Sequence, residues 1–223
     1  MSIRIENVEV FGWTAAIRGL RNPMNSWAKS DSYWTHIENP QSMNTAPFAF
    51  FLGENDLALM QRLCQAGSDD RKFMRYINVT MDITAPLYWW KEFDTYKVGT
   101  VANSCSTMHK IHAKEFTLDD FSHERMTEEA VYCLKDTIHM LNMARDAYHL
   151  TGKKEKQFWE DMIQLLPTSY NQLRTIQLNY EVLLRQYKAR KNHKLQEWRD
   201  YCAWIETLPY FLDITTPKEV HHE

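Results

Sequence analysis

The segment from Ile77 to Ile83, INVTMDI, alternates apolar and polar side chains without a break. This alternation predicts a β-strand whose buried face is made up of Ile77, Val79, Met81 and Ile83. The chain then runs into Ala85-Pro86 and a bulky segment that contains Leu87, Tyr88, Trp89, Trp90 and Phe93. Because proline is favoured in the first turn of a helix, we expect the strand to pass directly into a core helix.

Beyond Phe93 the sequence changes to small and hydroxyl-bearing residues, including Thr100, Asn103, Ser104, Ser106 and Thr107. Gly99 predicts the point at which the helix gives way to a polar loop. A loop of hydrogen-bonding side chains on a rigid helix is a common support for ligand binding. We therefore place the candidate site within residues 85–110. The alternative is a buried helix followed by a solvated turn.

The remaining segments predict few strands and several helices. Ile3, Ile5, Val8 and Val10 indicate an opening strand, and residues 29–51 are expected to form a loop. Helices are predicted over residues 14–27 with an end at Pro23, 55–65 with Asn55 as cap, 127–150, 158–166, from 168 or 169 through Tyr187, and 195–208. The tail with His221 and His222 is expected to fray. This pattern predicts an α+β fold, in which long helices cover a small, mainly antiparallel sheet.

Composition narrows the class of protein. No segment rich in Pro, Gly or Ser separates the predicted elements, so residues 1–223 are expected to form a single domain. The net charge of −3 does not favour general binding to nucleic acid or to a membrane surface. No apolar run is long enough to span a bilayer, and the charged, alternating N-terminal segment is unlike a signal peptide. The four cysteines are dispersed without a CxxC pair, which argues against a zinc site or a disulfide framework. We therefore expect a cytoplasmic protein without a bound metal.

A second group of polar residues lies far downstream. Leu166-Pro167 is followed in order by Asn179, Arg190 and His193. On one predicted helix, Asn179 and Arg190 would lie roughly three turns apart on the same face. Arg190 is a candidate phosphate ligand, because a guanidinium group can donate to two oxygen atoms at once. The alternative is a solvated helix end.

These two separated groups make the chain similar to the flavin-dependent thymidylate synthases. Members of that family carry an Ala-Pro-led aromatic helix after a strand, then the signature Arg-His-Arg-x-x-Ser, and farther on Leu-Pro followed by Asn, Arg and His. Arg18 and Arg21 also resemble a family segment that helps to frame the flavin. The resemblance implies a homotetramer that binds FAD and a pyrimidine nucleotide between its subunits. It further implies methylation of dUMP, with methylene-tetrahydrofolate and NADPH as co-substrates.

The resemblance also implies a set of site residues, without assigning a catalytic residue or a metal ligand. The residues implied for substrate binding are Glu92, Asn103, Ser106, Thr107 and Arg190. Those implied for FAD binding are Thr95, Tyr96, Lys97, Thr100, Asn179 and His193.

The signature itself departs from the family pattern. Its positions read Thr-Tyr-Lys-Val-Gly-Thr, so only Lys97 keeps a positive charge, and Thr100 replaces the serine. Thr107 and Glu181 stand where the family has arginines, and Glu92 replaces a glutamine directed at the nucleotide. Each lost arginine removes a charge-assisted phosphate contact worth about 1.5–3 kcal/mol. These departures favour a second hypothesis: a divergent paralogue that binds or modifies a different nucleotide or small ligand without thymidylate synthase activity.

Three further hypotheses follow from other residues. A structural or regulatory oligomer would use the aromatic surface as an interface. His109 and His112 have the spacing of two metal ligands on one helix face, although the sequence suggests no third ligand. Cys105 with His109 has the residue types of a nucleophile and its base, although a lone cysteine is more often a small buried residue.

Overall fold

The computed structural model describes residues 3–36 and 48–216. Its main sheet has four strands in the order β1-β4-β6-β5: β1 (Arg4–Phe11), β4 (Asn78–Pro86), β6 (Asn171–Asn179) and β5 (Val101–Ser104). Neighbouring strands are antiparallel, and β4 pairs with β6 along its whole length, from Asn78 opposite Asn179 to Pro86 opposite Asn171. The predicted α+β class with a small antiparallel sheet is confirmed.

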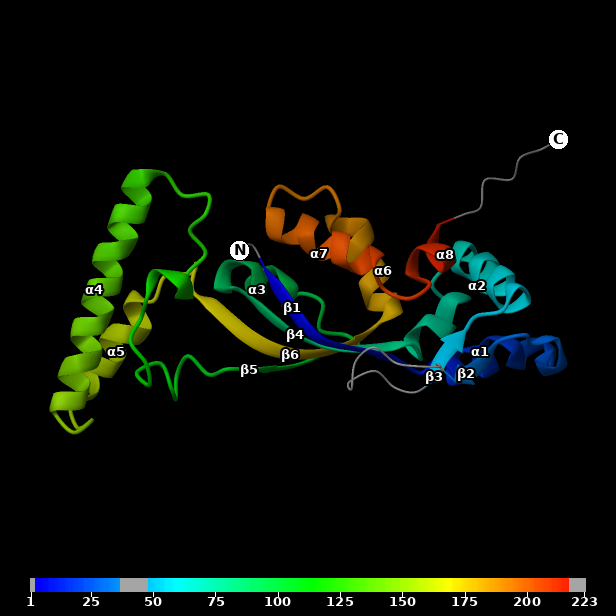
Figure 1. The fold of residues 1–223 in the computed structure, drawn as a ribbon, viewed down its shortest axis with the longest axis horizontal. Coiled ribbons are helices and arrows are strands. Elements are labelled where there is room, and N and C mark those ends of the chain that lie inside the picture. The colour runs from blue at the N-terminus through cyan, green and yellow to red at the C-terminus, as the bar shows by residue number, and fades with distance from the viewer. Residues whose placement is uncertain (1–2, 37–47, 217–223) are drawn as a thin grey trace.

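Residues 78–83 of the predicted strand lie in β4, which pairs with β1 and β6 in the middle of this sheet, and Ile77 directly precedes β4. The apolar side chains of the predicted strand, Ile77, Val79, Met81 and Ile83, are each at most 1% exposed. Three helices lie over this face: α3 (Leu87–Phe93), α6 (Tyr180–Arg190) and α7 (Gln196–Glu206) (Figure 1). The aromatic residues of the Ala-Pro segment are therefore core residues, and Trp89, Trp90 and Phe93 are almost completely buried.

Smaller groups of elements lie at the two ends of the sheet (Figure 1). At one end are α1 (Trp13–Arg21), the hairpin β2 (Tyr33–His36) and β3 (Phe48–Phe51), α2 (Glu54–Ala66) and α8 (Phe211–Thr215). At the other end α4 (Glu128–Leu150) and α5 (Lys156–Leu165) form an arm with its own hydrophobic cluster. Short 3-10 helices cover Asn22–Met24, Trp27–Lys29, Arg71–Arg75 and Leu118–Asp120. Among the described residues no helix combines the length and apolar character needed to cross a membrane.

The prediction of one helix from residue 168 or 169 through Tyr187 is wrong in its first half. Residues 171–179 form β6, and α6 begins only at Tyr180. Leu173, Ile176 and Tyr180 fit helical spacing, but Ile176 and Leu178 also fit the two-residue period of a strand. Residues 171–179 form a strand and not a helix because β6 pairs with β4 on one side and with β5 on the other.

Three other predictions need correction. The expected loop over residues 29–51 contains the hairpin β2–β3, in which Tyr33 pairs with Phe51. Residues 37–47 of that expected loop lie outside the described residues. The tail with His221 and His222, which was expected to fray, also lies outside them. The α3 helix ends at Phe93, well before Gly99, and part of the expected polar loop is the edge strand β5. Asn55 does not cap α2, because the side chain of Asp31 accepts hydrogen bonds from the first amides of that helix.

Gly12, which joins β1 to α1, is a position that only glycine fits. Its φ is +98°, and a Cβ atom there would lie 1.9 Å from the carbonyl oxygen of Tyr76. Gly152 also has positive φ, +62°, but nothing lies within 4 Å of its Cβ position. We expect Gly12→Ala to lower the free energy of unfolding more than Gly152→Ala, by about 1 kcal/mol or more, because only the first change adds a clash with backbone. Urea unfolding of both variants checks this, and equal losses would contradict the close approach of Gly12 to Tyr76.

Candidate functional site

Four of the residues singled out from the sequence meet in one place, together with a buried tryptophan. This Arg190 cluster consists of Glu92, Tyr96, Arg190, His193 and Trp198. Arg190 Nη1 donates to Glu92 Oε2 at 2.9 Å, and Arg190 Nε donates to the Tyr96 hydroxyl at 3.1 Å. Trp198 Nε1 donates to the same Glu92 oxygen at 2.7 Å. Two segments about a hundred positions apart in sequence therefore share one polar cluster.

The charge of Arg190 is largely compensated within this cluster. Its guanidinium forms an ion pair with Glu92 and lies over the ring of Trp198, 4.9 Å from the ring centre. His193 Nδ1 accepts a hydrogen bond from the Leu195 amide, so the proton of a neutral His193 lies on Nε2, 3.6 Å from Glu92 Oε2. The side chains of Arg190 and Glu92 keep 21% and 36% exposure, so a ligand can reach the ion pair from solvent.

Local structure explains why these side chains meet. Asn179 caps α6, because its Oδ1 accepts the Val182 amide at 3.1 Å, and Arg190 is the last residue of that helix. At the end of α3 the Thr95 hydroxyl donates to the Glu92 carbonyl at 2.7 Å. Asn179 and Arg190 therefore mark the two ends of α6, and the prediction that both lie within a helix on one face is wrong for Asn179.

The signature segment lies against the N-terminus of α6. Gly99 has φ of +80°, and a Cβ atom there would lie 3.2 Å from both Asn179 Nδ2 and a methyl group of Val182. Thr100 Oγ1 is buried and has no hydrogen-bond partner among the described residues. Lys97 is exposed, and the described part of the chain offers it no ion-pair partner. Thr100, Lys97 and the Asn179 amide are thus available as donors in one region.

The other predicted substrate residues lie farther along the sheet. Asn103 is exposed on β5 opposite Thr175, and Thr107 follows in a turn. Ser106 Oγ accepts the amides of Met108 and His109 at 3.1 and 3.0 Å, so it stabilises that turn. Ser106 also lines a cavity of about 430 Å³ beside Tyr170. Among the described residues no contact joins these three residues to the Arg190 cluster, so the chain on its own does not assemble the whole predicted set.

Two ion pairs near the site were not anticipated. Arg174 of β6 pairs with Asp94 at 2.8 Å and lies over Trp90, 4.3 Å from the ring centre. Arg71 binds both carboxylate oxygens of Glu181, at 2.7 and 3.2 Å, and this hydrogen bonding raises the pKa of Arg71. Glu181, at a position where the family has an arginine, is therefore matched by a cation from another segment. The only sequence signal for either ion pair is that its two residues carry opposite charges. Because the two residues are far apart in sequence, this signal does not indicate that they are partners.

The half-buried Tyr88 and the buried Glu197 form a further pair beside the cluster. The Tyr88 hydroxyl donates to Glu197 Oε1 at 2.6 Å, and burial together with this carboxylate raises the pKa of Tyr88. Because a tyrosine with a raised pKa stays protonated, this hydroxyl is a permanent donor to Glu197. The pair links α3 to α7 and keeps the two sides of the Arg190 cluster together.

The metal and nucleophile hypotheses find no support in the described residues. No group of three His, Cys, Asp or Glu side chains among them is placed to hold a metal ion. The ring of His112 packs against Tyr148 and His149 of α4, and burial lowers the pKa of His112. Cys105 is exposed, and no described contact joins it to His109.

Comparisons with known proteins identify the fold to which this chain belongs. No family model and no curated protein matches the chain. A solved structure of the flavin-dependent thymidylate synthase ThyX from Helicobacter pylori, complexed with FAD and dUMP, superposes with a TM-score of 0.65 over 96% of this chain and 97% of that chain. The chain has the fold of the flavin-dependent thymidylate synthases. This agrees with the resemblance that the sequence suggested.

The same fold is found in a second kind of protein. The UMP/dUMP methylase PolB from Streptomyces cacaoi, bound with 5-Br dUMP, superposes with a TM-score of 0.62 over 97% of this chain and 96% of that chain. Sequence identity is 14% to the ThyX structure and 12% to PolB. At such identities the comparison establishes the thymidylate synthase-like fold, and function has to be argued from the site.

Proposed function

We propose that this protein binds FAD and a pyrimidine nucleotide as a flavin-dependent thymidylate synthase-like protein. The observation that carries the proposal is the convergence of Glu92, Tyr96, Arg190 and His193 in one solvent-accessible cluster. These residues were selected from two distant sequence segments, and the fold brings them together. Both similar structures named above hold a pyrimidine nucleotide, and the ThyX structure also holds FAD.

The residues of the signature segment fit a flavin cofactor. Thr100 offers a buried hydroxyl without a partner, and the Asn179 amide group lies beside Gly99, where a side chain would crowd it. Lys97 supplies a positive charge suited to the pyrophosphate of FAD. With Tyr96 and His193, these residues would hold the cofactor, which when bound supplies hydride transfer. Thr95 contributes less, because its hydroxyl already donates to the Glu92 carbonyl.

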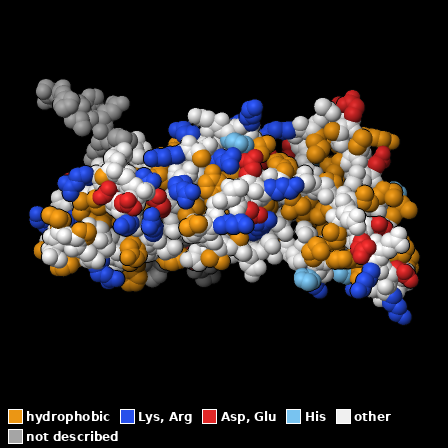
Figure 2. Space-filling view, turned by 180° about the vertical axis from the view of Figure 1, so that it is seen from behind, with side chains coloured by type: hydrophobic (Ala, Val, Ile, Leu, Met, Phe, Trp, Pro, Cys, Tyr) orange, Lys and Arg blue, Asp and Glu red, His pale blue; other side chains and the backbone are white. Residues whose placement is uncertain are grey.

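On this proposal Arg190 binds the nucleotide phosphate, while Asn103, Ser106 and Thr107 contact the nucleotide from a neighbouring subunit. A homotetramer would then complete the site. Exposed apolar side chains on α4 support an oligomer: Tyr132, Met140, Met143 and Leu150 are all more than half exposed on the arm, which lies at the right of Figure 2. Four free cysteines are consistent with a cytoplasmic location. Methylene-tetrahydrofolate and NADPH would be co-substrates if dUMP is methylated.

The Glu92–Arg190 ion pair favours a second candidate function. A phosphate must compete with Glu92 for the guanidinium, and Thr95 and Thr107 provide no charge where the family has arginines. A paralogue that keeps the fold but binds or modifies a different nucleotide or small ligand, without thymidylate synthase activity, would have this arrangement.

Flavin absorbance tests the first proposal. We expect the purified protein to bind added FAD saturably, with the shifted visible spectrum of a bound flavin, and Asn179→Ala to weaken that binding. A protein that stays colourless in excess FAD would contradict flavin binding. Complementation of a thymidine auxotroph then separates the two candidates: growth supports dUMP methylation, and failure by a soluble, FAD-loaded protein supports the altered paralogue.

A further inference from the structure

The Arg190 cluster has to change its balance of charges when a phosphate binds. Arg190 Nη1 donates to Glu92 Oε2 at 2.9 Å, so the guanidinium and the carboxylate neutralise each other in the free protein. A phosphate at Arg190 either displaces Glu92 or shares the guanidinium with it, and in both cases two anions then face one cation. Because like charges repel, Glu92 needs a second source of positive charge once a nucleotide is bound.

A buried indole keeps Glu92 from moving away. Trp198 Nε1 donates to the same Glu92 oxygen at 2.7 Å, and Trp198 is 0% exposed, so solvent water cannot take over as the acceptor. Turning Glu92 out into solvent would leave this N–H buried without a partner, an arrangement that folded proteins avoid. We therefore expect the carboxylate to stay in the cluster while a ligand binds.

His193 is placed to supply the missing charge. Among the described residues, Arg190 and His193 are the two groups within ion-pair distance of Glu92, and His193 Nε2 lies 3.6 Å from Glu92 Oε2. Histidine is the side chain whose charge changes most readily near neutral pH. The side chain of His193 keeps 23% exposure, so protons can reach it from solvent. It can therefore gain a charge when the cluster requires one, whereas an arginine is always charged.

The imidazole of His193 is held by neighbours on both sides. The Leu195 amide donates to His193 Nδ1 at 3.2 Å, and Arg199 of α7 donates to the His193 carbonyl oxygen at 2.7 Å. The ring of Trp198 lies edge-on to the imidazole, with the two ring centres 6.3 Å apart. The neutral imidazole therefore carries its proton on Nε2, beside Glu92, and a second proton would be added at Nδ1.

Arg190 controls whether a positive charge on His193 is favourable. The guanidinium of Arg190 from α6 and the carboxylate of Glu92 from α3 both lie beside the imidazole, because all three groups meet at Glu92 Oε2. The Tyr96 hydroxyl accepts from Arg190 Nε at 3.1 Å, which keeps the guanidinium in this position. In the free protein the charge of Arg190 opposes a second cation here. A bound phosphate compensates Arg190, so nucleotide binding favours the protonated imidazole.

We propose that His193 takes up a proton when a nucleotide phosphate binds Arg190, and that the imidazolium then replaces Arg190 as the counter-charge of Glu92. The inference rests on the proposed nucleotide function and adds a role for His193 to it. The proton comes from solvent and is added to Nδ1, where the Leu195 amide gives up its hydrogen bond. The proton on Nε2 faces the Glu92 carboxylate. Nucleotide affinity therefore depends on pH through His193, and a nucleoside without a phosphate does not show this dependence.

Isothermal titration calorimetry of dUMP binding in HEPES and in Tris counts the protons taken up, because the two buffers release protons with different heats. Protonation of the dUMP phosphate itself is common to wild type and His193→Gln, so the difference between them reports on His193. At about pH 7.5 we expect the wild type to take up about 0.5 proton more per dUMP than His193→Gln. Between about pH 7 and 8 its affinity should then fall about threefold more than that of the variant, because binding linked to proton uptake weakens as pH rises. Deoxyuridine should show neither difference.

Two further variants complete the test. His139→Gln, which changes an exposed histidine of α4, is the matched control and should take up as many protons as the wild type. Glu92→Gln should lower the uptake to the level of His193→Gln, because the carboxylate that requires a counter-charge is gone.

The outcomes separate this proposal from the proposed function. Equal proton uptake by wild type and His193→Gln, with dUMP still bound, would overturn the role of His193 and leave nucleotide binding intact. Uptake that persists in His193→Gln and is lost in Glu92→Gln would also overturn it, because Glu92 itself would then be the protonated group. An equal loss of uptake in His139→Gln would contradict a local effect. A wild-type protein that does not bind dUMP would overturn both proposals.

Discussion

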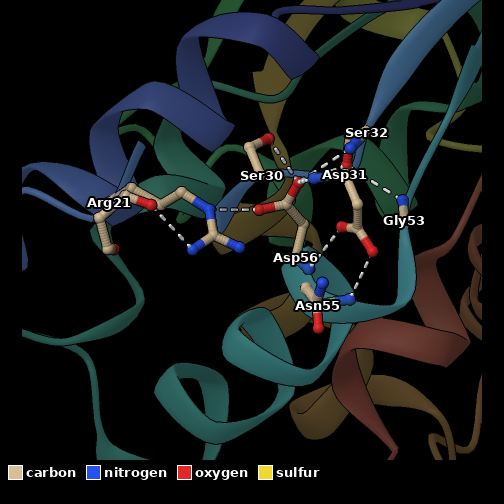
Figure 3. Close-up of polar contacts among 8 residues, drawn as sticks. Arg21, Ser30, Asp31, Ser32, Gly53, Asn55 and Asp56 are labelled. Carbon is tan, nitrogen blue, oxygen red and sulfur yellow. Dashed lines mark hydrogen bonds and ion pairs between the residues drawn. The ribbon is translucent and has the colours of Figure 1, made fainter. Parts of the chain in front are cut away.

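Replacing Asp56 with asparagine is expected to lower the free energy of unfolding by about 3–5 kcal/mol. Asp56 is fully buried, and its partner Arg21, whose Nε donates to Asp56 Oδ1 at 2.6 Å, is 3% exposed (Figure 3). The asparagine side chain would fill the same space, but it would leave the Arg21 guanidinium buried without a counter-charge. Removing one partner of a buried ion pair costs far more than the pair contributes relative to apolar residues, because the remaining charge is no longer solvated.

The same network makes stability depend on pH. Burial alone would raise the pKa of Asp56, but hydrogen bonds from Ser32, Ser30 and Arg21 more than offset it, so its pKa in the folded protein is lowered. The folded state therefore favours the ionised form. This contribution is fully present above the pKa of an unfolded aspartate, about 3.9, and is lost as the pH falls through the lower folded value. Asp56→Asn should remove this part of the acid sensitivity.

Urea unfolding at neutral and acidic pH measures both effects. Asp136→Asn, an exposed acid on α4, is the matched control and should change stability by less than about 0.5 kcal/mol. The double variant Arg21→Gln/Asp56→Asn should lose less than the sum of the two single variants, because neither charge is then left alone. Additive losses, or an Asp56→Asn protein as stable as the Asp136 control, would show that the buried pair does not form.

Replacing Glu92 with glutamine is expected to tighten dUMP binding by about tenfold. An amide still accepts the Trp198 indole N–H, but it no longer neutralises Arg190. One charge-assisted contact to a phosphate oxygen is worth about 1.5–3 kcal/mol, so freeing the guanidinium corresponds to at least a factor of ten. Arg190→Gln should weaken dUMP binding by a similar factor. Arg185→Gln, an exposed residue of the same helix, is the control and should change the affinity less than twofold.

Periodicity was sufficient to predict the parts of the fold that repeat over several residues. The helix at 127–150 and the start of the strand at 77–83 were predicted to within one residue, because each has an unbroken apolar face, but β4 continues to Pro86, which was expected in the first turn of the next helix. Residues 171–179 were misassigned because their apolar positions fit both periods, and only pairing with β4 and β5 resolves them. The hairpin β2–β3 and the edge strand β5 were missed because a short strand is defined mainly by its partner.

In the candidate site, too, some features could be predicted from the sequence and others depend on how the chain folds. Glu92, Tyr96, Arg190 and His193 were identified from motif order, and they meet in the folded chain. Their mutual contacts were not foreseen, because a sequence does not show that Glu92 reaches the Arg190 guanidinium before any ligand does. Opposite charges far apart in sequence, as in Arg71–Glu181, become a pair only when the helices and strands are placed in space.

The central claim is that Arg190 binds the phosphate of a nucleotide and that Glu92 competes for it. Titration calorimetry of wild-type and Glu92→Gln proteins with dUMP and with deoxyuridine, which lacks the phosphate, tests it most directly. We predict that Glu92→Gln raises the affinity for dUMP about tenfold and leaves the affinity for deoxyuridine unchanged. An equal gain for both ligands, or no gain for dUMP, would show that Arg190 does not bind the phosphate.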